Sequence, residues 1–243
     1  MTVTIPRIAS YPMPDEAPPA AGQPRWRPDP LRSALLIHDM QRYFLDFFPP
    51  ARSPTVELVA NTVRARQAAR SAGVPVLYSA QPGRMSRSER GLLHDIWGAG
   101  MTGEPRGGEI IDELRPAPDE LVVTKYRYSA FFGTGLAGRL SALGRDQLII
   151  CGVFAHIGCL FTAGDAFSHD IETFLVADAV ADFSLTDHLM ALGYAAGRCA
   201  VPITTDRLRE ALAPRPAPAG APSRRVRPGR RWRASDRSAG GDS

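Results

Sequence analysis

The chain has 243 residues, of which 44% are hydrophobic and 22% are charged, a composition typical of a soluble globular protein with one large domain or two small ones. No stretch approaches the roughly 20 consecutive apolar residues of a membrane-spanning helix, and the N-terminus lacks the apolar run of a secretory signal. Three irregularly spaced cysteines argue against a disulfide framework and indicate reduced thiols in a cytoplasm.

The excess of positive charge lies at the C-terminus. Residues 214–243 hold eight arginines and two aspartates, so in a chain with a formal net charge of +4 the rest carries a net charge of −2. A segment rich in Arg, Pro and Gly cannot form a packed core, and we expect a disordered tail that either aids solubility or binds polyanions weakly. We expect neither a membrane nor a specific nucleic acid as partner.

An extended, proline-rich arm is predicted over residues 1–30, followed by one domain over residues 31–213. Six short apolar runs rich in Val, Ile and Leu are typical of strands buried on both faces, at 33–39, 74–80, 120–125, 147–153, 172–178 and 200–205. Helical patterns separate them, at 56–71, 134–143, 157–169, 185–199 and 206–212. This alternation predicts an α/β domain with a parallel sheet covered by helices on both faces. The long connection 81–118 is expected to cover a substrate.

Polar residues stand where the predicted strands end. In parallel sheets ligands bind beyond the carboxyl ends of the strands, and the first three ends carry an acid, an amide and a cation: Asp39, Gln81 and Lys125. The long connection adds Arg90 and Trp97. One acid, two cations, an amide and an aromatic ring favour a small anionic substrate with a flat ring.

Each of these residues has a structural alternative. Asp39 could cap the following helix. Lys125 and Arg90 could be solvated surface charges, and Trp97 could be ordinary packing. His38, next to Asp39 on a strand, is expected to point to the opposite face of the sheet. The histidine spacing predicts no metal site, and without a glycine-rich phosphate loop no cofactor is expected.

Five segments, in order, resemble the isochorismatases of catecholate-siderophore and phenazine-type pathways. They are LLIHDMQRYFL (35–45), SAQPGRMSRSERGLLHDIWGAGM (79–101), TKYRYSAFF (124–132), CGVFAHIGC (151–159) and FLVADAVADFS (174–184). The resemblance runs from about residue 5 to residue 206. It implies a three-layer α/β/α, Rossmann-like domain with a six-stranded parallel sheet, a homodimer and no cofactor.

The turn after the fourth predicted strand has a glycine where related cysteine hydrolases, such as nicotinamidases, carry their nucleophile. Those enzymes use an Asp–Lys–Cys triad, so the resemblance implies that Asp39 and Lys125 remain while Gly158 replaces the thiol. A glycine at a helix start leaves backbone N–H groups open to a carboxylate. Cys159 would point about 100° away around the helix, and we interpret it as a buried structural thiol.

The resemblance implies hydrolysis of the enol-pyruvyl ether of isochorismate to pyruvate and 2,3-dihydro-2,3-dihydroxybenzoate. Asp39 would donate the proton, and Lys125 would pair with Asp39 and contact the substrate. Backbone N–H groups near Phe154 and Gly158 would hold the pyruvyl carboxylate, and a non-proline cis peptide is expected at Val153–Phe154. The implied substrate-binding residues are Gln81, Arg90, Trp97, Phe154, Tyr128 and Phe44.

The identity of the substrate stays open because the family usually has tyrosine where Phe154 stands. One candidate is 2-amino-2-deoxyisochorismate, which would give a dihydro-3-hydroxyanthranilate, and the motif HDMQRYFL favours this phenazine-type branch. Two other functions remain open. One is a cysteine amidohydrolase of the nicotinamidase type that uses Cys159, and the other is a non-catalytic binding protein.

Overall fold

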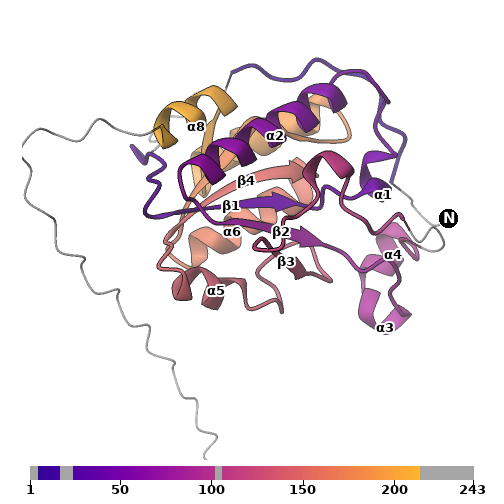
Figure 1. Cartoon of the computed structure of the whole chain (residues 1–243). Helices are drawn as coiled ribbons and strands as arrows, with labels where there is room; N and C mark the ends of the chain where they lie inside the picture. The colour runs from indigo at the N-terminus through magenta and orange to yellow at the C-terminus, as the bar shows by residue number, and fades with distance from the viewer. Residues whose placement is uncertain (1–4, 17–23, 102–105, 214–243) are drawn as a thin grey trace, which may run out of the picture.

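The computed structural model describes residues 5–16, 24–101 and 106–213, and the tail predicted over 214–243 lies outside them. Six strands form one parallel sheet in the order β3-β2-β1-β4-β5-β6 (Figure 1). They are β1 (Ser33–His38), β2 (Val76–Ala80), β3 (Leu121–Thr124), β4 (Gln147–Val153), β5 (Glu172–Ala181) and β6 (Val201–Ile203). All six predicted strands are confirmed, and β5 extends further than its apolar run indicated.

Helices cover both faces of this sheet, so the three-layer α/β/α arrangement is confirmed (Figure 1). One layer holds α2 (Thr55–Ser71) and α8 (Thr205–Leu212). The other holds α5 (Leu136–Ala142), α6 (Leu160–Ser168) and α7 (Leu185–Arg198). Shorter elements lie in the connections: α1 (Arg42–Leu45), α3 (Arg87–Arg90), α4 (Leu93–Trp97), the 3-10 turn η1 (Asp112–Leu114) and the π-helical turn η2 (Ala155–Cys159).

The central strand shows why the apolar runs are continuous. In β1, Leu35 and Ile37 pack into one helical layer while Ala34 and Leu36 pack into the other, and all four are completely buried. Side chains of a strand alternate between faces, so a strand covered on both sides needs apolar residues at every position.

The order of the strands reverses at β1. The chain adds β2 and β3 on one side of β1 and then returns to place β4 on the other side. In open parallel sheets this switch point leaves a crevice beyond the carboxyl ends of the two strands, where ligands bind. Asp39 follows β1 and the turn with Gly158 follows β4, so the fold brings both to this crevice.

The N-terminal arm packs against the domain. Residues 5–16 contain no helix or strand, yet Ile8 and Tyr11 are buried. The Ile8 N–H donates to the Phe47 carbonyl at 2.8 Å, and the Tyr11 hydroxyl accepts from the Asp182 N–H at 2.8 Å. These contacts hold the arm at the carboxyl edge of the sheet.

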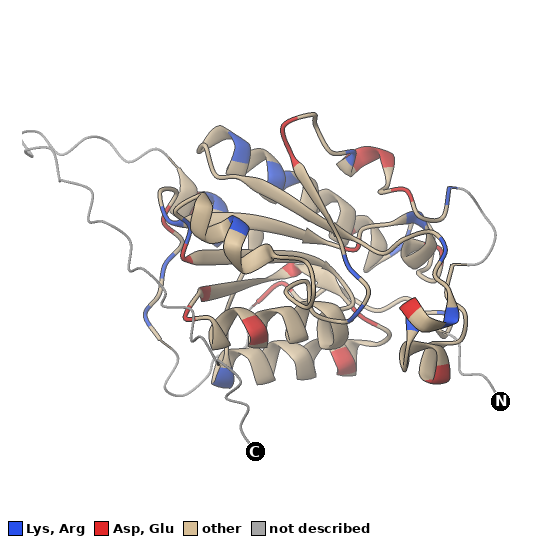
Figure 2. Ribbon diagram, turned by 90° about the horizontal axis from the view of Figure 1, so that it is seen from below, with Lys and Arg blue, Asp and Glu red and all other residues tan. Residues whose placement is uncertain are grey.

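Acidic and basic residues are mixed over the helices and loops of the described chain (Figure 2). All three cysteines are unpaired and buried. Within residues 5–16, 24–101 and 106–213, no helix has the length and apolar character needed to cross a bilayer.

Candidate active site

One cavity at the carboxyl edge collects all nine residues for which the sequence predicted a role. Its lining contains Asp39, Phe44, Gln81, Arg90, Trp97, Lys125, Tyr128, Phe154 and Gly158, together with Ile5, Leu93, Val153, Ile157 and Phe183. The free volume is about 50 Å³, so the cavity is small. The arm contributes Ile5 and the long connection contributes Gln81, Arg90 and Trp97, so segments far apart in the sequence enclose it.

Asp39 leaves β1 in a left-handed conformation, with φ 50°, which aspartate tolerates better than most residues. The regular alternation of the strand ends at this point. His38 and Asp39 therefore approach one another, with His38 Nδ1 3.7 Å from Asp39 Oδ1. The expectation that His38 points to the opposite face is wrong, because alternation of side chains holds only while the backbone stays extended.

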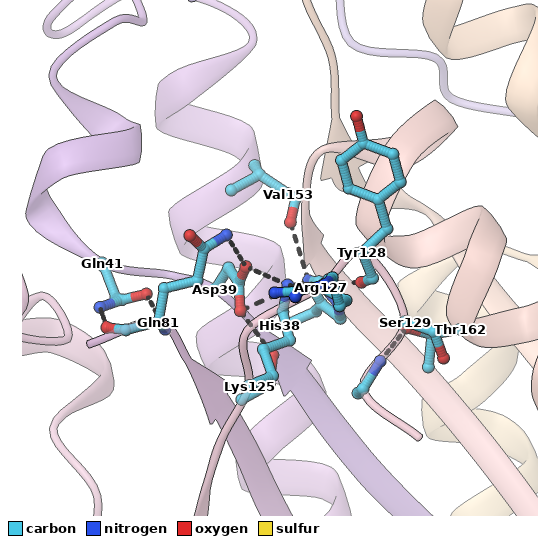
Figure 3. A network of polar contacts seen from close by, with 12 residues as sticks. His38, Asp39, Gln41, Gln81, Lys125, Arg127, Tyr128, Ser129, Val153 and Thr162 are labelled. Carbon is cyan, nitrogen blue, oxygen red and sulfur yellow. Dashed lines mark hydrogen bonds and ion pairs between the residues drawn. The ribbon is translucent and has the colours of Figure 1, made fainter. Parts of the chain in front are cut away.

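Three donors surround the Asp39 carboxylate, and two of them, Lys125 and Gln81, are labelled in Figure 3. Lys125 Nζ lies 2.8 Å from Oδ2, the Ser79 hydroxyl donates to Oδ1 at 2.6 Å, and Gln81 Nε2 donates to Oδ2 at 3.5 Å. Burial would raise the pKa of Asp39, but the Lys125 ammonium and the donated hydrogen bonds outweigh burial and hold that pKa below its usual value. Asp39 is thus a carboxylate in the free protein, and it does not cap the following helix, since the N-cap residue of α1 is Gln41.

Lys125 is 1% exposed and is not a surface charge. Besides Asp39, its Nζ donates to the backbone carbonyls of Arg127 at 2.9 Å and Tyr128 at 3.3 Å (Figure 3). An ammonium has three donors, so all three are engaged within the protein. Lys125 therefore fixes the position and the charge of Asp39, and any contact it makes with a substrate replaces one of these bonds.

Arg90 is a buried cation that faces the cavity. It lies at the end of α3, whose start is fixed by a capping box between Ser86 and Glu89. Its Nε donates to the Gly98 carbonyl at 2.8 Å and its Nη1 to Gln81 Oε1 at 3.3 Å. Burial lowers the pKa of Arg90, and its hydrogen-bond partners in the described ranges are neutral oxygens. Such a guanidinium suits an incoming carboxylate.

Aromatic rings form the opposite wall of the cavity. Phe154 lies 4.7 Å from Phe183 and 5.8 Å from Phe44, measured between ring centroids. Trp97 stands 5.8 Å from Phe183 at an angle of 68° and donates its Nε1–H to the Tyr128 hydroxyl at 2.7 Å. These rings leave a narrow apolar slot beside the polar groups.

The turn after β4 has the expected cis peptide between Val153 and Phe154. It continues as the π-helical turn η2, a form frequent at functional sites. Within it the N–H groups of Ile157 and Cys159 donate to the Phe154 carbonyl at 3.2 Å each, and the His156 N–H donates to Asp182 at 2.6 Å. Those three amides are engaged, so the predicted binding of a carboxylate by this turn falls to its remaining N–H groups.

Cys159 packs away from the cavity. It is 0% exposed and lies among the apolar side chains beneath α5, α6 and α7. Burial raises the pKa of the Cys159 thiol well above its ordinary value. A neutral thiol without access to solvent is a poor nucleophile, as expected of a structural cysteine.

The sequence reasoning did not find two polar residues that support the site. Ser79 is a fully buried hydroxyl within β2, and its bond to Asp39 was visible beforehand only as a polar residue inside an apolar run. Gln41 holds Gln81 from both sides, donating to the Gln81 carbonyl and accepting from the Gln81 N–H at 2.8 Å each. Phe183 lies within a segment that carried the resemblance but was given no role.

A larger and more open hollow, about 530 Å³, lies at the opposite edge of the sheet beside β2 and β3. Among its charged residues, Arg70 and Glu120 pair at 2.7 Å. The Arg70 side chain is 45% exposed, so this hollow lacks the buried cations found at the carboxyl edge.

The fold and the cavity define an enzyme with a three-layer α/β/α fold. Its site holds the buried Asp39 carboxylate together with the buried cations Lys125 and Arg90, and Gly158 contributes no side chain. The model of the Isochorismatase domain matches residues 33–207. The chain belongs to the isochorismatase family.

The chain is similar to several known proteins. It is 51% identical to the phenazine biosynthesis protein PhzD1 of Pseudomonas aeruginosa, over 85% of this chain and 99% of the relative. It is 50% identical to the isochorismatase of Bacillus subtilis, over 88% of this chain and 69% of the relative. Among solved structures, a cysteine hydrolase from Pseudomonas syringae matches with a TM-score of 0.72 and 26% identity, covering 79% of this chain and 98% of that one.

Proposed function

We propose that this enzyme hydrolyses the enol-pyruvyl ether of isochorismate, or of 2-amino-2-deoxyisochorismate, by general acid catalysis. The observation that carries the proposal is the pairing of Asp39 with Lys125 in a cavity where Gly158 stands in place of a nucleophile. The names of its relatives, an isochorismatase and a phenazine biosynthesis protein at about half identity, support the same reaction.

The proposed chemistry needs a proton and water. Protonated Asp39 gives its proton to the methylene carbon of the vinyl ether, which leaves an oxocarbenium ion at the ether carbon. Water adds to that carbon and loses a proton, and the hemiketal collapses to pyruvate and a ring alcohol. The proton released returns the carboxylate to its acid form, so the atoms balance without a covalent enzyme intermediate.

The surrounding groups would orient the substrate. Arg90 and Gln81 would bind a carboxylate, and the slot between Trp97, Phe154 and Phe44 would hold the ring. Small-molecule sites have volumes of roughly 300 Å³ or more, whereas this cavity has about 50 Å³. We therefore expect the segment carrying α3 and α4, or the arm at Ile5, to move outward when the substrate enters.

A pyruvate-release assay with isotopically labelled water tests the proposal. In deuterated water the pyruvate methyl group is expected to gain one solvent deuterium, compared with pyruvate incubated alone with the enzyme. In ¹⁸O-labelled water the ring product is expected to keep its original oxygen, because the bond that breaks joins that oxygen to the pyruvyl carbon. Labelled oxygen in the ring alcohol would rule out the proposed step.

Two variants separate proton transfer from thiol chemistry. Asp39→Ala is expected to abolish pyruvate release, since it removes the proton donor, whereas Cys159→Ala is expected to retain it. The reverse pattern would favour a cysteine amidohydrolase. Folded wild-type enzyme that releases no pyruvate from either candidate substrate would favour a binding function. Offering both substrates side by side gives the preference between them.

We also propose a cytoplasmic homodimer. Three unpaired cysteines support a reducing compartment. Large apolar side chains exposed on the neighbouring helices α6 and α7, namely Phe161, Phe167, Met190 and Tyr194, support association with a second copy. Light scattering at micromolar concentration is expected to give twice the mass of one chain.

A further inference from the structure

The ring of His38 fills the space into which a side chain at position 158 would project. A β-carbon built on Gly158 would lie 2.2 Å from His38 Cε1, 2.9 Å from Nδ1 and 3.0 Å from Nε2. Non-bonded carbon atoms approach to about 3.5–4.0 Å. No side chain fits at position 158 while the imidazole stays where it is.

The backbone does not by itself require this glycine. Gly158 lies in η2 and is not among the described glycines with positive φ, so an L-residue could adopt its conformation. The three atoms nearest to the added β-carbon all belong to the histidine ring. Gly152 shows the same closeness from the other side, because a β-carbon there would lie 2.1 Å from the His38 carbonyl oxygen. Two glycines thus border a single residue.

His38 cannot easily move aside. It is 0% exposed, and its Nδ1 lies 2.9 Å from the Val153 carbonyl oxygen (Figure 3). A carbonyl only accepts, so Nδ1 carries the proton and the hydrogen bond holds the ring against the turn. Burial also lowers the pKa of His38 to about 4, so at neutral pH the ring is uncharged beside the Asp39–Lys125 pair.

We propose that His38 is a specificity-determining residue that restricts this site to chemistry without a covalent intermediate. Its imidazole takes the place of a nucleophile's side chain, next to the acid and the cation that would otherwise activate one. The inference concerns the type of reaction and is independent of which chorismate derivative is the substrate. Removal of the ring should open position 158 to a side chain.

A double-mutant cycle on thermal unfolding tests the steric part. Gly158→Ala in the wild-type background is expected to lower the unfolding midpoint by about 2–10 °C, as overpacking of a core does. In the His38→Ala background the same change should leave the midpoint unchanged or raise it. The matched control is Gly164→Ala in α6, where a β-carbon meets nothing within 4 Å, and it should be tolerated in both backgrounds.

Thiol labelling tests the functional part. Gly158→Cys combined with His38→Ala introduces a sulfur into the cavity that Lys125 also lines, where a reagent smaller than the substrate can enter. Mass spectrometry after treatment with iodoacetamide should locate S-alkylation at position 158, with loss of iodide, at least about tenfold faster than any labelling in His38→Ala alone. The native thiols are buried and serve as the internal reference.

Two results would overturn the proposal. One is additivity of the Gly158→Ala and His38→Ala changes, because the ring would then not be what excludes the side chain. The other is failure of the introduced thiol to alkylate in the folded double variant. If Gly158→Ala does not fold at all, recovery of folded protein on adding His38→Ala is the supporting result and its absence the contrary one. None of these measurements depends on pyruvate release.

Discussion

Replacement of Arg90 by methionine should separate substrate binding from folding. Arg90 is 7% exposed, and within residues 5–16, 24–101 and 106–213 its side chain donates to neutral oxygens, the Gly98 carbonyl and Gln81 Oε1. Burial of a cation without a counter-ion is unfavourable for folding. Burial of the Arg90 guanidinium therefore lowers the stability of the free protein, and binding of an anionic substrate would offset this desolvation free energy.

The size of the effect follows from this geometry. Loss of one partner from a buried, hydrogen-bonded charge pair costs about 2–5 kcal/mol, so kcat/KM should fall about 30- to 5,000-fold in Arg90→Met. Stability should change little, because the two lost hydrogen bonds and the relieved desolvation oppose one another. A shift of the unfolding midpoint within about 4 °C in either direction corresponds to a net change of roughly 1 kcal/mol.

The control is Arg87→Met, on the same short helix. The Arg87 side chain is 74% exposed and makes surface contacts with Asp95 at 3.5 Å and with His94 Nδ1 at 3.2 Å, so neither kcat/KM nor the midpoint should change measurably. Steady-state pyruvate release and thermal unfolding, measured on the same preparations, give both quantities. If Arg90→Met kept kcat/KM within threefold of wild type while its midpoint fell sharply, Arg90 would stabilise the fold of its loop and would not bind the substrate.

Two further outcomes are expected. Because the pKa of Asp39 is lower in the folded protein than in the unfolded chain, its ionisation contributes stability above about pH 4 that is lost as the pH falls through the folded pKa. The difference in unfolding free energy between wild type and Asp39→Asn should therefore shrink between pH 7 and pH 3.5, and a difference that grows on acidification would contradict this. Phe154→Tyr should change the ratio of kcat/KM for the two candidate substrates by about 2- to 10-fold, the worth of one hydrogen bond. An unchanged ratio would mean that the added hydroxyl contacts neither substrate.

Much of the fold was predictable because burial restricts which residue types occur at neighbouring positions of the sequence. Strands covered on both faces need apolar residues at consecutive positions, and the runs at 33–39 and 147–153 correspond closely to β1 and β4. Residues at the strand ends were equally accessible, since the carboxyl ends of parallel strands share one edge. Asp39, Gln81 and Lys125 meet there for that reason.

Features that depend on a single dihedral angle or on contacts between distant residues have no local sequence pattern, and they were not predicted. Nothing in the sequence around His38 reports that φ turns positive at the next residue, and so its contact with Gly158 was not foreseen. Ser79 reads as one polar residue in an apolar run, and its bond to Asp39 depends on the register between β1 and β2. Ile5 reaches the cavity only because the arm folds back over the domain.

The remaining difficulty is how an ionised carboxylate becomes a proton donor. In the free enzyme Lys125 and the donated hydrogen bonds keep the pKa of Asp39 low, which opposes protonation.

We expect the substrate to reverse this balance and to raise the pKa of Asp39. Its carboxylates bring negative charge next to the buried side chains of Asp39, Lys125 and Arg90, where charges interact more strongly than in water. Arg90 offsets only part of that charge. A carboxylate that draws the Gln81 amide or the Lys125 ammonium away from Asp39 also removes a donor that stabilised the anion, and both effects raise its pKa. On this argument the descending limb, where activity falls with rising pH as Asp39 loses its proton, should lie at higher pH for kcat than for kcat/KM, because kcat reports Asp39 in the complex and kcat/KM reports it in the free enzyme. Coincident limbs would mean that the substrate does not raise the pKa of Asp39.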